Sequence, residues 1–105
     1  MIFSGWRGEI EIINSSVVLR KKPDMSDYMI PFSQIVSTEI KKPGLMSNGC
    51  IFIRTIGSHG TSETMTKFDY AMDKNSLFFT KSMYEDALSF KKELDERLST
   101  YLQSK

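Results

Sequence analysis

Polar and apolar residues alternate regularly within the first eighty positions of this chain. Residues 9–12, Glu-Ile-Glu-Ile, alternate with a period of two, which is typical of a strand with one buried face. Residues 14–16, Asn-Ser-Ser, have short polar side chains that favour a turn, and residues 17–19 are rich in β-forming side chains. This pattern predicts a hairpin in which residues 8–13 pair with residues 16–21.

More strands are predicted between this hairpin and residue 80. Pro31 cannot donate to a strand ladder, so it closes a short strand or lies on its edge. In the next segment the alternation predicts that Val36, Thr38 and Ile40 point inward. The predicted strands are residues 28–30, 35–41, 50–56 and 76–80, and an ambiguous strand pattern occupies residues 65–72.

The last part of the chain has helical periodicity. Ser82 and Glu85 match a capping box, in which the two side chains bond to the first backbone N–H groups of a helix. We therefore predict a helix over residues 83–103. Its apolar face is a stripe of residues that recur at three- and four-residue steps: Ala87, Phe90, Leu94, Leu98 and Tyr101.

These elements predict one domain over residues 1–105, with strands at about 8–80 followed by the helix. The expected class is mainly β, with six or seven antiparallel strands. A small sheet of many short strands curls, and we expect it to form a barrel whose open end the helix covers. In residues 30–35, Pro31 ends one strand, Ser33 can cap a single turn and Ile35 begins the next strand, which predicts a sharp corner.

Composition narrows the class of protein without naming a function. The chain has 105 residues, of which 40% are hydrophobic and 26% charged, a balance typical of a folded globular protein. Its net charge of +1 excludes a protein steered as a whole toward polyanions. No apolar run is long enough for a membrane-spanning helix, and the N-terminus does not resemble a signal peptide, so we expect a cytoplasmic protein.

Catalytic and metal-binding chemistry lack the necessary partners. His59 is the single histidine, in a polar loop, and Cys50 is the single cysteine, at the start of an apolar strand. Zinc needs three or four nitrogen, sulfur or oxygen ligands, and acid–base catalysis needs an oriented partner for the histidine. We expect no catalytic residue, no metal and no cofactor, and interpret His59 as a solvated loop residue and Cys50 as a structural thiol.

Two groups of side chains are candidates for binding. If the second and fourth predicted strands end on the same side, five cations gather into a cluster that could hold phosphate, as a lipid headgroup or nucleic acid, or could simply keep strand ends solvated. A second group is apolar: Trp6 either anchors a partner or folds back as a plug, and two apolar residues lie at a loop tip. The first group is Arg20, Lys21, Lys22, Lys41 and Lys42; the second is Trp6, Leu45 and Met46.

The order of elements and several short motifs resemble pleckstrin-homology-like domains, in particular a branch of small bacterial domains that also occurs in phage-related genes. The resemblance implies a PH-like barrel. In the pleckstrin-homology domains that bind phosphoinositides the first hairpin loop is basic, whereas the predicted loop at residues 14–16 has no basic residue. The matching motifs are GxxGEIEI at residues 5–12, VVLRK at 17–21, IPFSQI at 30–35, GCIFI at 49–53, NSLFF at 75–79 and AxxFK at 87–91.

Two hypotheses about function follow. The first is a non-enzymatic protein-interaction or assembly module that self-associates or binds another protein, which for a phage-encoded example would be a host protein. The second is a peripheral binder of an anionic ligand through the basic cluster, which predicts binding that weakens steeply with salt.

Overall fold

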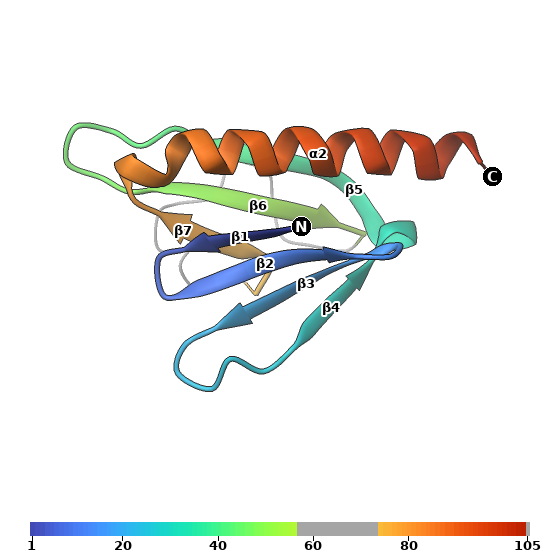
Figure 1. The fold of residues 1–105 in the computed structure, drawn as a ribbon, viewed down its shortest axis with the longest axis horizontal. Coiled ribbons are helices and arrows are strands. Elements are labelled where there is room, and N and C mark those ends of the chain that lie inside the picture. The colour runs from blue at the N-terminus through green and yellow to red at the C-terminus, as the bar shows by residue number, and fades with distance from the viewer. Residues whose placement is uncertain (57–73, 105) are drawn as a thin grey trace.

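The computed structural model describes residues 1–56 and 74–104, which form two antiparallel sheets and a C-terminal helix (Figure 1). This confirms a mainly β class with seven strands and one C-terminal helix. His59 and the ambiguous segment 65–72 lie outside the described residues. The four-stranded sheet contains β1 (Ile2–Gly5), β2 (Gly8–Ile13), β3 (Ser16–Lys21) and β4 (Tyr28–Pro31), and the three-stranded sheet contains β5 (Ile35–Lys41), β6 (Gly49–Thr55) and β7 (Ser76–Phe79).

The hairpin predicted from alternation is confirmed residue for residue. In β2 and β3, Gly8 pairs with Lys21 at one end and Ile13 with Ser16 at the other. Asn14 adopts a positive φ of 52° in the two-residue turn, a conformation that asparagine tolerates better than most residues. A single 3-10 turn at Phe32–Gln34 forms the predicted corner between the two sheets, although no side chain caps it.

Strand β1 was missing from the sequence prediction. Ile2–Gly5 pairs with β2, and of its side chains only Phe3 is buried, so the strand is too short to show an alternating pattern. The first hairpin loop is therefore Trp6–Arg7 rather than residues 14–16. Phe3 belongs to the core, whereas the Trp6 side chain is half exposed and does not fold back as a plug.

The prediction that Val36 points inward was wrong. The register of β5 against β6 shifts between Ile35 and Ser37, which is a β-bulge. Val36 is the extra residue of this bulge, and its side chain is exposed to solvent. Ile35 and Ile40 pack against the core. A bulge is a matter of pairing with the neighbouring strand, and the sequence of one strand does not reveal it.

The helix α2 spans Tyr84–Gln103, and its predicted apolar stripe is confirmed. Ala87, Phe90 and Leu94 are buried, and Leu98 and Tyr101 pack against the same core. The prediction of a capping box at Ser82 and Glu85 was wrong. A 3-10 turn at Lys81–Met83 leads into the helix, no side chain caps the first turn, and the Ser82 hydroxyl instead lies 3.0 Å from the Thr80 hydroxyl.

One apolar core joins the two sheets and the helix. Phe3 of β1 lies with its ring centre 5.9 Å from that of Phe79 of β7 and 6.2 Å from that of Phe90 of α2. None of the described strands pairs from one sheet to the other, so they do not close into a barrel. A backbone hydrogen bond of 2.8 Å, from the Trp6 N–H to the Phe78 carbonyl, links the sheets at one end.

The position of Phe3 gives a test of the unpredicted strand. Replacing Phe3 with alanine should lower the free energy of unfolding by about 3–5 kcal/mol, because it opens a cavity between both sheets and the helix. The neighbouring Ile2→Ala variant is a matched control, since Ile2 is on the outward face, and should change it by less than about 0.5 kcal/mol. Urea unfolding followed by circular dichroism measures both, and equal effects of the two substitutions would contradict this placement of β1.

Candidate interaction surface

The most exposed apolar side chains of the described chain lie in the loop between β5 and β6, residues 42–48, here called the hairpin loop. Leu45 is 91% exposed and Met46 is 93% exposed. The loop is nevertheless tied at its base, because Pro43 is buried and the Gly44 N–H donates to the Ser47 hydroxyl at 3.2 Å. Figure 1 shows the loop projecting past the start of α2, in agreement with the near-complete exposure of its two apolar side chains.

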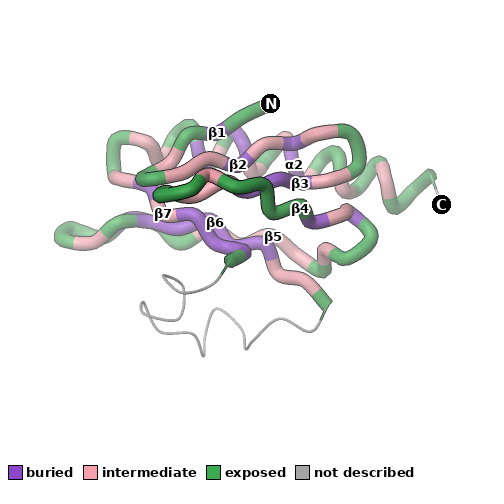
Figure 2. Tube along the Cα trace, turned by 90° about the horizontal axis from the view of Figure 1, so that it is seen from below, coloured by how far each residue is buried: buried purple, intermediate pink, exposed green. Residues whose placement is uncertain are grey.

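The turn between β1 and β2, which contains Trp6, lies at the same end of the molecule's long axis as the hairpin loop (Figure 1). Figure 2 draws the same trace from below. The guanidinium carbon of Arg7 lies over the Trp6 ring, 5.7 Å from the ring centre, which is a cation–π arrangement. Strand pairing connects the two features, since Trp6 bonds to Phe78, which pairs with Cys50, which in turn pairs with Lys41 at the base of the loop. The three residues predicted as an apolar interface therefore share one end of the fold, here called the distal end.

Four of the five predicted cations also lie at the distal end. Lys21 pairs with Gly8 beside the Trp6–Arg7 turn, and the Lys22 N–H bonds to the Arg7 carbonyl at 2.9 Å. Lys41 and Lys42 lead into the hairpin loop. The charges of both Lys21 and Lys41 lower the pKa of the Cys50 thiol, so one cation from each sheet lies within electrostatic range of this side chain.

Arg20 does not join these lysines. Its guanidinium lies on the outer face of the four-stranded sheet, bonded to Glu9 and Asp27 at 2.7 Å each and to Glu11 at 3.1 Å. Hydrogen bonds to Asp27, Glu11 and Glu9 raise the pKa of Arg20, so the cation is permanent and its charge is met within the chain. Sequence reasoning grouped Arg20 with Lys21 and Lys22, although the register of the predicted hairpin already places Glu9 opposite Arg20.

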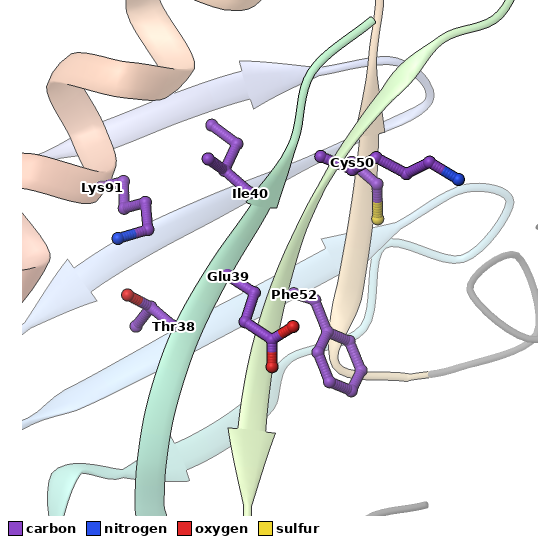
Figure 3. Close-up of a pocket in the computed structure, with 7 residues that line it drawn as sticks. Thr38, Glu39, Ile40, Cys50, Phe52 and Lys91 are labelled. Atoms are coloured by element: carbon purple, nitrogen blue, oxygen red, sulfur yellow. The ribbon is translucent and has the colours of Figure 1, made fainter. Parts of the chain in front are cut away.

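A pocket of about 470 Å³ lies along β5, between the distal end and α2 (Figure 3). On its helix side Thr38 donates a hydrogen bond to Asp95, which also accepts one from Lys91 at 2.6 Å. On its other side the Oε1 atom of Glu39 is buried, and no hydrogen-bond partner for it occurs among residues 1–56 and 74–104. The lining residues are Thr38, Glu39, Ile40, Lys41, Cys50, Phe52 and Lys91.

The thiol in this pocket is not a nucleophile at neutral pH. Burial raises the pKa of Cys50 to about 12, an effect that outweighs the neighbouring lysine charges. A thiol attacks only as the thiolate, and reactive cysteines have lowered rather than raised pKa values. The structure thus assigns Cys50 to packing, beside Phe52 and the partly buried Phe78.

Within the described ranges, 1–56 and 74–104, no group of three or more histidine, cysteine, aspartate or glutamate side chains is placed to hold a metal ion. No helix there combines the length and the apolar character needed to cross a membrane.

The buried thiol makes stability depend on pH. The pKa of an unfolded cysteine is about 8.5, and below that pH the thiol is neutral in both states and its full contribution to the stability of the folded state is present. As pH rises from about 8.5 toward the folded pKa, only the unfolded state loses its proton, so the free energy of unfolding falls. Between pH 7.5 and pH 10 we expect the wild type to lose about 2 kcal/mol of unfolding free energy relative to Cys50→Ala. Urea unfolding of both proteins at the two pH values measures this difference, and parallel pH profiles would contradict it.

Comparisons with family models, with curated proteins and with solved structures each found no match to this chain. The features that bear on function are therefore those of the chain itself. They are a distal end with exposed apolar side chains and lysines, and beside it a pocket whose thiol is unreactive.

Proposed function

We propose that this protein is a non-enzymatic protein-interaction module with a pleckstrin-homology-like fold, and that its contact surface is the distal end. The observation that carries the proposal is the near-complete exposure of Leu45 and Met46 on a loop that is tied at its base. An apolar side chain that packs against nothing in its own chain gains free energy when a partner covers it. Methionine adapts its shape to varied partners, and tryptophan with arginine is frequent among the residues that dominate interfaces.

The PH-like part of the proposal is supported by the order of elements. Four antiparallel strands, a sharp corner, three antiparallel strands and a C-terminal helix follow one another along the chain. The motifs noted in the sequence fall where this arrangement needs them. Residues 30–35 form the corner, and Gly49, where an added Cβ would meet the Phe79 ring at 2.4 Å, allows β6 to start tightly against β7.

An anionic ligand is the second candidate. A specific observation favours it, because β3 ends at Lys21 and β5 ends at Lys41, at the same end of the fold although the two strands belong to different sheets. Lys22 and Lys42 are adjacent to them in sequence and both are exposed. Four cations at one end could meet phosphate groups of a lipid headgroup or a nucleic acid, without Arg20.

The interaction function predicts a set of partners that depends on the hairpin loop. Affinity capture from a cell lysate with the Leu45→Ser/Met46→Ser variant should lose proteins that the wild type retains, by about tenfold or more, because the substitutions remove the apolar contact without touching the core. Leu102→Ser is the matched control, since Leu102 is an exposed leucine of α2. Quantitative mass spectrometry compares the captured sets, and identical sets for all three proteins would refute the assignment of the loop.

The anionic-ligand function predicts a different response to salt. Binding of the wild type to a fluorescent oligonucleotide or to vesicles containing an anionic lipid should fall steeply between 50 and about 200 mM salt, because each phosphate contact releases counterions. Lys21→Glu/Lys22→Glu should abolish this binding, and the Lys92→Glu variant on α2 should retain it. Fluorescence anisotropy and vesicle sedimentation measure the two ligands, and unchanged binding by the double variant would exclude this function.

A further inference from the structure

The outer face of the four-stranded sheet carries exposed apolar side chains beside a cluster of charges. Neighbouring strands place Ile2, Glu11, Val18 and Met29 in one cross-strand row, by the registers of the three pairs. Ile2 is 52% exposed and Met29 is 56% exposed, at the two ends of this row, and Val18 is buried between them. The solvated face of an antiparallel sheet is ordinarily polar, so this row is a candidate contact surface.

The same face carries surplus negative charge. Three carboxylates, those of Glu9, Glu11 and Asp27, surround the single guanidinium of Arg20, which leaves two negative charges uncompensated within the cluster. The Asp27 side chain is the most accessible of the three, at 65% exposed. A partner that fits this face therefore combines apolar side chains with cations.

The hairpin loop of this same chain has that chemistry. Leu45 and Met46 supply apolar side chains, and Lys41 and Lys42 supply two positive charges at the base of the loop. The loop belongs to the three-stranded sheet (Figure 1). The outer face of the four-stranded sheet with Glu9, Glu11 and Asp27, here called the acidic face, is turned away from the shared core. Two complementary surfaces thus lie on different parts of one nearly neutral molecule, which has a net charge of +1.

We infer that the hairpin loop of one copy docks on the outer face of the four-stranded sheet of a second copy, an inference that rests on the proposed interaction function. Leu45 and Met46 cover the row between Ile2 and Met29, while the lysines face the carboxylates around Arg20. The contact joins two different surfaces, so a bound pair still offers one free hairpin loop and one free sheet face. Such heterologous contacts continue into a closed ring or an open filament instead of stopping at a symmetric dimer.

The test begins with the mass of the protein by light scattering behind size exclusion. The wild type should exceed 12.1 kDa as concentration rises, and less so at high salt, because charges contribute to the contact. Lys41→Glu/Lys42→Glu and, separately, Asp27→Lys/Met29→Lys should each weaken association by about tenfold or more. Lys92→Glu is the charge-reversal control on α2 and should associate as the wild type does, and circular dichroism verifies that each variant is folded.

Mixing the two weakened variants gives the sharper result. The lysine variant keeps an intact acidic face, and the Asp27/Met29 variant keeps an intact hairpin loop, so one of each should form a dimer of twice 12.1 kDa that grows no further. Association of the wild type without such a dimer, or unaltered association of either variant, would overturn the docking geometry.

Two outcomes would assign the distal end to another occupant. If the wild type stays monomeric at every concentration but the hairpin loop still selects proteins from a lysate, the second copy is excluded and the interaction function stands. If the monomer instead sediments with vesicles of seven parts phosphatidylcholine to three parts phosphatidylserine, and Lys41→Glu/Lys42→Glu does not, a lipid surface replaces the second copy. If neither occurs, both the inference and the proposed function fail.

Discussion

Three phenylalanine rings hold the three layers of this molecule together. Phe3 comes from the four-stranded sheet, Phe79 from the three-stranded sheet and Phe90 from the helix, and Phe3 contacts the other two. No strand of the described chain pairs across the sheets, so side-chain packing does the work that a continuous ladder does in a closed barrel. The hairpin loop belongs to one sheet and the acidic face to the other, so the position of each relative to the other follows from this contact.

The parts of the fold that were predictable are those that one segment determines by itself. The alternation of β2 and β3 gives their pairing, and the three- and four-residue spacing on α2 gives its buried face. Strand β1 was not predictable because it has a single buried side chain and is held by β2. The bulge at Val36 likewise depends on pairing with β6. At Ser82 a 3-10 turn and a contact with the Thr80 hydroxyl replace the predicted cap.

The candidate surface was predictable to a similar extent. Leu45 and Met46 lie between proline, glycine and asparagine residues that favour a loop, which is why their exposure could be foreseen. Arg20 was grouped wrongly because adjacent residues of a strand point to opposite faces, so Arg20 and Lys21 cannot share a site merely by being neighbours. The predicted hairpin register already places Glu9 opposite Arg20, whereas Asp27 comes from the loop before β4 and is brought to Arg20 only by the fold.

The hydrogen bond from the Trp6 N–H to the Phe78 carbonyl places the only tryptophan of the chain at the junction of the two sheets. The indole also lies under the Arg7 guanidinium, so its surroundings depend on the geometry of this turn. Tryptophan emission therefore reports the junction itself, whereas the far-ultraviolet signal of α2 reports the helix. A change in fluorescence that precedes the loss of helical signal would mean that the sheets separate before the molecule unfolds.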